Sequence, residues 1–122
     1  MIDAIVREFG DLLGMGGLEL QSDGTLVLEI EPADTLCLVS GRDCLHVSLS
    51  RSHQYPHTPS AARLLELVHF EKNNGHGTRC RRTDFGRTNV FMETLSIEGL
   101  RGSDILDVLD RLTKLHNASE SL

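Results

Sequence analysis

The stretch Leu18-Glu19-Leu20-Gln21-Ser22-Asp23-Gly24-Thr25-Leu26-Val27-Leu28-Glu29-Ile30 decides the fold class. Apolar residues recur at every second position on both sides of Ser22-Asp23-Gly24. A period of two is typical of a strand with one buried face, and Asp-Gly favours a tight turn. The stretch therefore predicts two strands joined by a turn. Pro32 ends the second strand, because proline cannot donate to a sheet ladder.

Four further strands are predicted downstream of Pro32. Thr35–Val39 and Cys44–Ser50 are joined by a turn at residues 40–43, and Leu45, Val47 and Leu49 of the second strand face one way. Gly77–Thr83 and Thr88–Leu95 are joined by a turn at residues 84–87. Short connections between neighbouring strands favour antiparallel pairing, so we expect a mostly antiparallel sheet with one buried face.

Three helices are predicted around these strands. The first presents an apolar stripe and stops at Gly14, Gly16 and Gly17, since glycine takes the left-handed conformation that a helix end needs. The second opens at Thr58-Pro59-Ser60, and the third begins at Ser103 with Asp104 in its first turn. The order is helix, strands, helix, two strands, helix. We therefore expect an α+β fold, with helices packed on a twisted sheet, in one domain spanning residues 1–122.

The second predicted helix is apolar over more than half of its circumference. Ala61, Leu64, Leu65 and Val68 form one stripe, whereas Leu67 and Phe70 lie off it. One sheet cannot cover so wide an apolar surface. The helix is therefore either central in the core or packed against another subunit.

Composition and charge narrow the class of protein. The chain has 122 residues, 39% of them hydrophobic and 25% charged, which is ordinary for a globular domain and excludes a disordered chain. No apolar run approaches the roughly 20 residues of a membrane helix, and no secretory signal is visible, so we expect a cytosolic protein. The net charge of −6 argues against general nucleic-acid binding. Residues 72–87 are an exception, because they contain five basic residues and one acidic residue and have a net charge of about +4.

The residue types of catalytic and metal sites occur without the spacing that such sites need. Cys37, Cys44 and Cys80 contain no CxxC pair, so we expect reduced thiols. His53 and His57 flank a proline-containing segment, and that pattern is more typical of a loop than of a zinc site. We therefore expect no catalytic residues, no metal and no cofactor.

Several segments together resemble a known family. They are Phe9-Gly10-Asp11-Leu12-Leu13-Gly14, the stretch of residues 18–30, Leu67-Val68-His69-Phe70-Glu71-Lys72-Asn73, and Leu95-Ser96-Ile97-Glu98-Gly99-Leu100 before the last helix. In order, size and acidity they resemble the class I type III secretion chaperones, over residues 2–116. The chain departs from that family at Thr78-Arg79-Cys80-Arg81-Arg82-Thr83, which is basic on both faces.

The resemblance implies a homodimer of the bacterial cytoplasm that is not an enzyme. Its partners would be the N-terminal segment of a secreted effector, kept soluble and export-competent, and the type III secretion apparatus, with neither nucleic acid nor membrane. The implied effector-binding residues are Phe9, Leu13, Leu20, Leu26 and Leu28. The implied dimer-interface residues are Leu64, Leu67, Val68, Phe70, Val90 and Met92.

Two alternatives stay open at this point. Any one of these apolar residues can belong to the core, because apolar residues at regular spacing usually face inward. The protein can also be a small regulatory adaptor whose basic hairpin, residues 78–87, docks a protein or a nucleic acid. Against nucleic acid, the hairpin offers only Phe85 as a stacking platform.

Overall fold

The computed structural model describes residues 2–31, 33–53, 61–69, 77–83 and 86–120. Its elements, in chain order, are α1 (Ile2–Leu12), β1 (Thr25–Glu31), β2 (Asp34–Ser40), β3 (Cys44–Ser52), α2 (Ala61–Leu67), β4 (Arg79–Thr83), β5 (Thr88–Ser96) and α3 (Gly102–Glu120). The five strands form one antiparallel sheet in the order β1-β2-β3-β5-β4. The predicted α+β fold class is confirmed.

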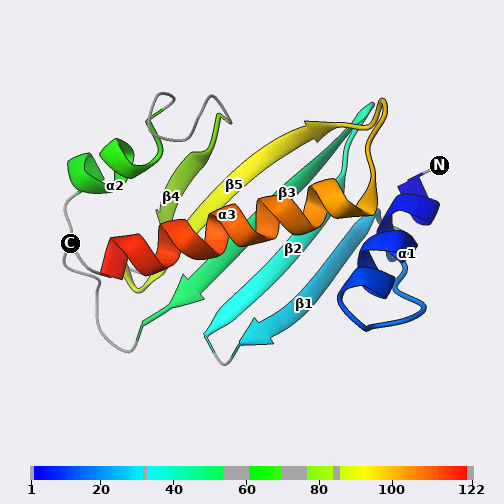
Figure 1. Ribbon diagram of the computed structural model, residues 1–122. Coiled ribbons are helices and arrows are strands. Elements are labelled where there is room, and N and C mark those ends of the chain that lie inside the picture. Colours follow the sequence, from blue (N-terminus) through cyan, green and yellow to red (C-terminus); the bar gives the residue numbers. More distant parts are fainter. Residues whose placement is uncertain (1, 32, 54–60, 70–76, 84–85, 121–122) are drawn as a thin grey trace.

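Helix α3 lies diagonally across one face of the sheet, and both α1 and α2 contact α3 (Figure 1). Alternate residues of the central strands point toward α3 and are completely buried, including Leu36, Val47 and Phe91. The residues of α3 that face these strands include Ile105 and Leu112, which are also completely buried. We call this covered side of the sheet the inner face. The opposite side, the outer face, carries no helix among the described residues.

Polar groups on the inner face anchor α3 at two places. Glu93 of β5 is 2% exposed and accepts two hydrogen bonds from the Arg111 guanidinium, from Nη2 at 2.7 Å and from Nε at 3.1 Å. Nearer the end of the helix, Nε2 of His116 lies 2.7 Å from the Leu49 carbonyl oxygen, and its ring meets Phe91 edge-on. Both contacts join α3 to strands far away in sequence, so they set where the helix lies along the sheet.

The strand predicted at residues 18–21 is absent, and that prediction is wrong. The turn at residues 22–24 forms as expected, with Gly24 at a φ of 81° and the Asp23 carboxylate accepting from the Thr25 amide. The two ends of the turn are joined, because the Gln21 amide donates to the Thr25 carbonyl oxygen. Leu18 instead lies against Gly10 of α1. Burying Leu18 against the helix competes with extending the sheet.

The start of α3 also differs from the prediction. The helix begins at Gly102, so Ser103 is not its cap. Instead the Asp104 carboxylate accepts from the Arg101 amide at 2.9 Å, and Glu8 of α1 accepts from the Gly102 amide. A Cβ atom at residue 102 would come 2.5 Å from the backbone nitrogen of Phe9. Glycine is required because α1 passes this close, and α1 then supplies the acceptor that Ser103 was expected to provide.

Some predictions fall outside the described residues. This group comprises the proposed opening of the second helix at residues 58–60, the site residue Phe70, and residues 84–85 of the turn at 84–87. In the part of the chain that the structure describes, no helix is long and apolar enough to cross a membrane.

We predict that His116 makes stability fall at acidic pH. Burial is the main cause that lowers the pKa of His116 below its ordinary value of 6.5, while the Leu49 carbonyl acts in the opposite direction. Below about pH 6.5 the unfolded chain takes up a proton that the folded chain resists, so the free energy of unfolding falls, by at most about 1.4 kcal/mol per pH unit from this residue.

Urea unfolding of the wild type and of His116→Gln, followed by circular dichroism from pH 7.5 to pH 5, tests this prediction. The variant should lose less stability on acidification than the wild type. Because the other histidines are the same in both proteins, the difference isolates residue 116. Equal slopes in the two proteins would contradict the prediction.

Candidate functional site

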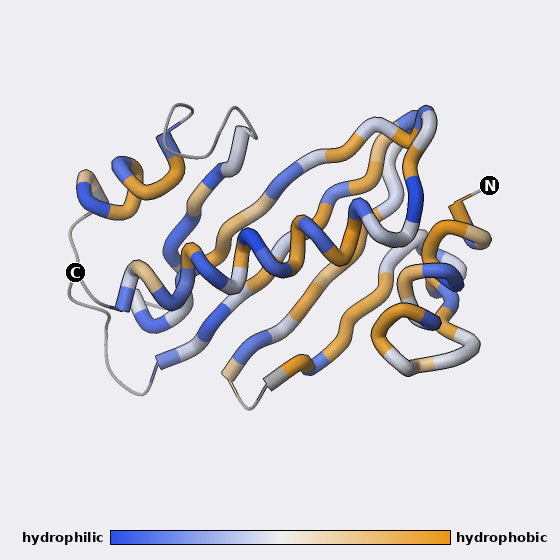
Figure 2. Tube along the Cα trace, in the orientation of Figure 1, coloured by the Kyte–Doolittle hydropathy of each residue, from blue (hydrophilic) through white to orange (hydrophobic). Residues whose placement is uncertain are grey.

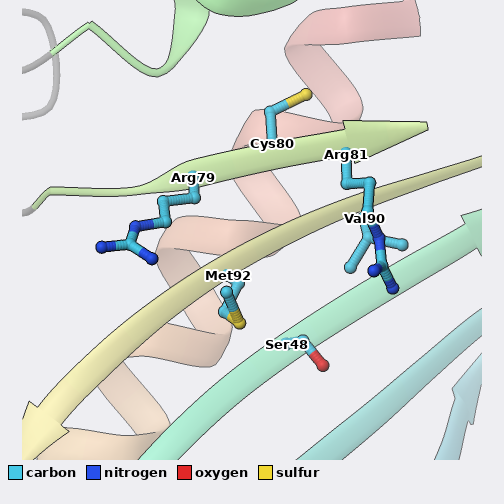
Figure 3. Close-up of a pocket in the computed structure, with 6 residues that line it drawn as sticks. All are labelled: Ser48, Arg79, Cys80, Arg81, Val90 and Met92. Carbon is cyan, nitrogen blue, oxygen red and sulfur yellow. The ribbon is translucent and has the colours of Figure 1, made fainter.

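A hollow of about 330 Å³ lies on the outer face where β4, β5 and β3 run side by side (Figure 3). Its walls come from Ser48, Arg79, Cys80, Arg81, Val90 and Met92. The register explains the grouping, because Arg79 pairs with Met92 and Arg81 pairs with Val90 across the β4–β5 ladder. Apolar side chains thus form the floor, and two guanidinium groups stand beside them.

The two arginines of the hollow are exposed on an edge strand. Neither Arg79 nor Arg81 forms an ion pair with another described residue. Charged residues on an edge strand hinder pairing with the edge of another sheet. The hollow therefore combines apolar surface with positive charge, and its edge resists joining to an identical edge.

The basic residues of β4 do not form one surface. Arg82 is on the inner side, where its Nε donates to the Asn89 side-chain oxygen at 3.1 Å. Cys80 shares that side and packs against the core, and burial is the main cause that raises the pKa of its thiol. The alternation of the strand thus separates Arg79 and Arg81 from Arg82, although all three are close in sequence.

The predicted dimer-interface residues divide between core and surface. Val90 and Met92 are partly exposed in the hollow. Leu64 and Val68 are 2% and 9% exposed, and Leu67 packs partly buried against the core. Leu65, which the stripe of the second helix was expected to bury, is instead 58% exposed. The sequence did not predict the exposure of Leu65, because an apolar stripe does not show which of its residues contact α3.

The predicted effector-binding residues lie near β1 at the other edge of the sheet. Phe9 and Leu26 are buried, so they support that surface from beneath. Leu13, Leu20 and Leu28 are partly buried and pack against the same core. We call these three residues the β1-edge leucines. Strand β1 is an edge strand, because it pairs with β2 alone.

Three exposed apolar side chains at this end of the molecule were not predicted as site residues. Leu12 is 50% exposed, Met15 is 43% exposed, and Val27 of β1 is 55% exposed. The exposure of Val27 could have been predicted from the alternation of the strand, because Val27 points to the opposite face from its neighbours Leu26 and Leu28. Leu12 lies three residues after the buried Phe9 in the apolar periodicity of the first helix, but as the last residue of α1 it is exposed. Figure 2 shows the apolar character of α1 and β1.

Solved structures similar to this chain include complexes of secretion chaperones. No protein-family model matches the chain, and no curated protein matches its sequence. The fold itself is that of the type III secretion chaperones, as the sequence resemblance implied. The similarity extends over nearly the whole chain in each case.

Three of these structures show the extent of the likeness. A chain of the ExsC–ExsE complex has a TM-score of 0.79 at 13% identity, covering 99% of this chain and 92% of that chain. The Yersinia pestis type III secretion chaperone SycH, in complex with a stable fragment of YscM2, has a TM-score of 0.72 at 16% identity and covers 100% and 99%. The HopA1–SchA chaperone–effector complex has a TM-score of 0.70 at 15% identity and covers 97% and 91%.

We predict that Gly10→Ala destabilises the protein, although alanine normally favours a helix. A Cβ atom at residue 10 would come 2.6 Å from the Met15 carbonyl oxygen and 2.9 Å from Leu18 Cδ1. Relieving that overlap must move backbone and the leucine that packs on α1, at a cost of about 1–3 kcal/mol. Urea unfolding measures the effect.

Gly16→Ala is the matched control, because nothing lies within 4 Å of the Cβ position there. Its free energy of unfolding should stay within about 0.5 kcal/mol of the wild type. Equal effects of the two substitutions would contradict the role assigned to the close approach at Gly10.

Proposed function

We propose that this protein is a dimeric chaperone that binds the N-terminal segment of a secreted effector. The observation that supports it most is the likeness of the whole fold to chaperones solved with their partners. In this role the protein is not an enzyme. It acts in the bacterial cytoplasm, keeps the effector soluble, and passes it to the type III secretion apparatus.

The β1 edge is where we place the effector segment. An extended peptide can add a strand to an exposed sheet edge, with backbone hydrogen bonds for affinity and apolar side chains for specificity. The β1-edge leucines, together with exposed Leu12 and Val27, offer apolar surface beside that edge. Because an effector segment that is disordered beforehand loses conformational entropy on binding, a large apolar contact is needed to offset the cost.

The second subunit packs on the hollow and on α2 in this proposal. Val90 and Met92 give the floor of the hollow, and Leu65 and Leu67 add apolar surface from α2. Pairing these surfaces covers the apolar part of α2 that the sheet does not bury. A two-fold axis places the same surface of both subunits in the interface.

We predict that the protein has twice its protomer mass of 13.5 kDa in solution. Light scattering on the eluted protein should show the dimer, and Val90→Asp should convert it to the monomer, because a carboxylate would be desolvated in the interface. Val39→Asp places the same charge on the outer face away from the hollow and should leave the mass unchanged. A monomeric wild type would contradict the dimer proposal.

We predict that the tagged protein captures one larger protein through the N-terminal region of that protein. Mass spectrometry of the complex from a native lysate identifies the partner, and a truncation that lacks its N-terminal region should abolish capture. Leu13→Ser with Leu20→Ser should weaken binding at least about tenfold, since each removes a buried apolar contact.

Leu106→Ser is the control for this loss, because Leu106 is also partly buried against the core but lies on α3. This single substitution should lower stability by about as much as either β1-edge substitution alone, without weakening capture. Capture that depends equally on all three leucines would indicate a loss of folding and would contradict the assignment of the β1 edge.

The exposed arginines favour a second candidate, the regulatory adaptor. Arg79 and Arg81 stand together beside the hollow on a chain of net charge −6. An arginine-driven contact weakens steeply with salt, whereas binding to the apolar β1 edge survives several hundred millimolar salt. Capture that is lost at high salt and in the Arg79→Ala/Arg81→Ala variant would favour the adaptor over the chaperone.

A further inference from the structure

Three side chains on the outer face form a hydrogen-bonded line near the start of β3. The Cys44 Sγ atom lies 3.6 Å from Nε2 of His46, and Nδ1 of His46 lies 2.9 Å from Oγ1 of Thr94. Cys44 and His46 share a face because they are two residues apart on one strand, and Thr94 pairs with His46 from β5. The line therefore has the order of an activated nucleophile: a thiol, a base, and a group that orients the base.

The backbone beside this line leaves room for the thiol and the ring. A Cβ atom at Gly41 would come 2.7 Å from the Cys44 Sγ and 3.2 Å from Nε2 of His46. Any larger residue at position 41 would push the sulfur or the imidazole out of place. Cys44 and His46 are both partly exposed on the face that no described helix covers. A small molecule can therefore approach the sulfur.

We propose that Cys44 is a thiol-modification site for low-molecular-weight disulfides, with His46 as the base. In the tautomer that carries the proton on Nδ1, Thr94 accepts the hydrogen bond and Nε2 is left as a proton acceptor facing the thiol. As Sγ attacks one sulfur of the disulfide, its proton passes to Nε2, a new S–S bond forms and the old S–S bond breaks. The leaving thiolate then takes the proton from His46. The sulfur of Cys44 is oxidised, and the leaving sulfur is reduced.

The other two cysteines are internal controls for this chemistry. Cys37 is also partly exposed on the outer face, but it makes no hydrogen bond to a histidine among the described residues. Cys80 packs against the core on the inner side of β4, and its burial raises the pKa of the thiol. The structure thus holds one thiol with a base, one without a base, and one partly buried against the core.

The test is the rate at which each cysteine of the intact protein reacts with 2-hydroxyethyl disulfide, a neutral probe, at pH 7.5. Mass spectrometry of the digested protein gives the three rates separately. Cys44 should react about tenfold faster than Cys37, a modest share of what a positioned base can supply. In urea the three rates should converge, because the advantage comes from the fold. A Cys44 rate equal to that of Cys37 in the folded protein would overturn the proposal.

Variants distinguish a fast Cys44 rate that is due to His46 acting as the base from one that is due to exposure of the sulfur alone. His46→Asn should lower the Cys44 rate to that of Cys37, and Thr94→Val should lower it about threefold by releasing the ring. Cys37→Ser should leave the Cys44 rate unchanged. An unchanged Cys44 rate in His46→Asn would overturn the proposal even if the wild-type thiol is fast. Since the wild-type comparison needs no substitution, the proposal stays testable if a variant fails to fold.

Discussion

The packing of α3 on one side of the sheet, with α1 and α2 against α3, is the constraint on which the other features depend. Strand residues that face α3 are mostly buried and apolar, and the buried Glu93 among them is paired with Arg111. Residues of the opposite parity stay partly exposed, so that face can hold cysteine, histidine, arginine and methionine together. The hollow and the Cys44–His46–Thr94 line both lie on this uncovered face. One-sided packing thus leaves a broad surface for contact with other molecules.

The polar anchors of α3 determine how the helix is placed on that sheet. An apolar stripe alone tolerates sliding, because leucine against leucine is similar at several positions. The Glu93 carboxylate is 2% exposed and paired with Arg111. Sliding the helix would leave this buried charge without its partner, which costs about 3–5 kcal/mol. Thr78 also donates to Glu93, so the segment entering β4 is tied to the same point. The position of the helix and the edge that holds Arg79 and Arg81 are therefore coupled through one carboxylate.

Sequence periodicity was sufficient for the elements whose burial is one-sided and was insufficient where distant segments meet. The alternation in Cys44–Ser50 and Thr88–Leu95 predicted both strands, which form at Cys44–Ser52 and Thr88–Ser96, because one face of each is buried. Leu18–Gln21 has the same alternation, but Leu18 packs against Gly10 of α1, and no local pattern shows that contact. The cap of α3 comes from Glu8, which is 94 residues before Gly102. The resemblance implied Val90 and Met92 as interface residues, and both line the hollow, whereas the exposure of Leu65 depends on how α2 meets α3.

The two edges of the sheet differ in chemistry, and the difference favours different neighbours. At β4, pairing with the β4 of another copy would bring arginines of both copies together, and like charges directly opposite are unfavourable. Strand β1 has no basic residue, and Val27 is exposed on its outer face, whereas Leu13 and Leu20 pack partly buried against the core. An extended apolar segment therefore finds less repulsion and more apolar contact at β1 than at β4. An exposed apolar edge is prone to aggregation, so we expect a partner to cover the β1 edge.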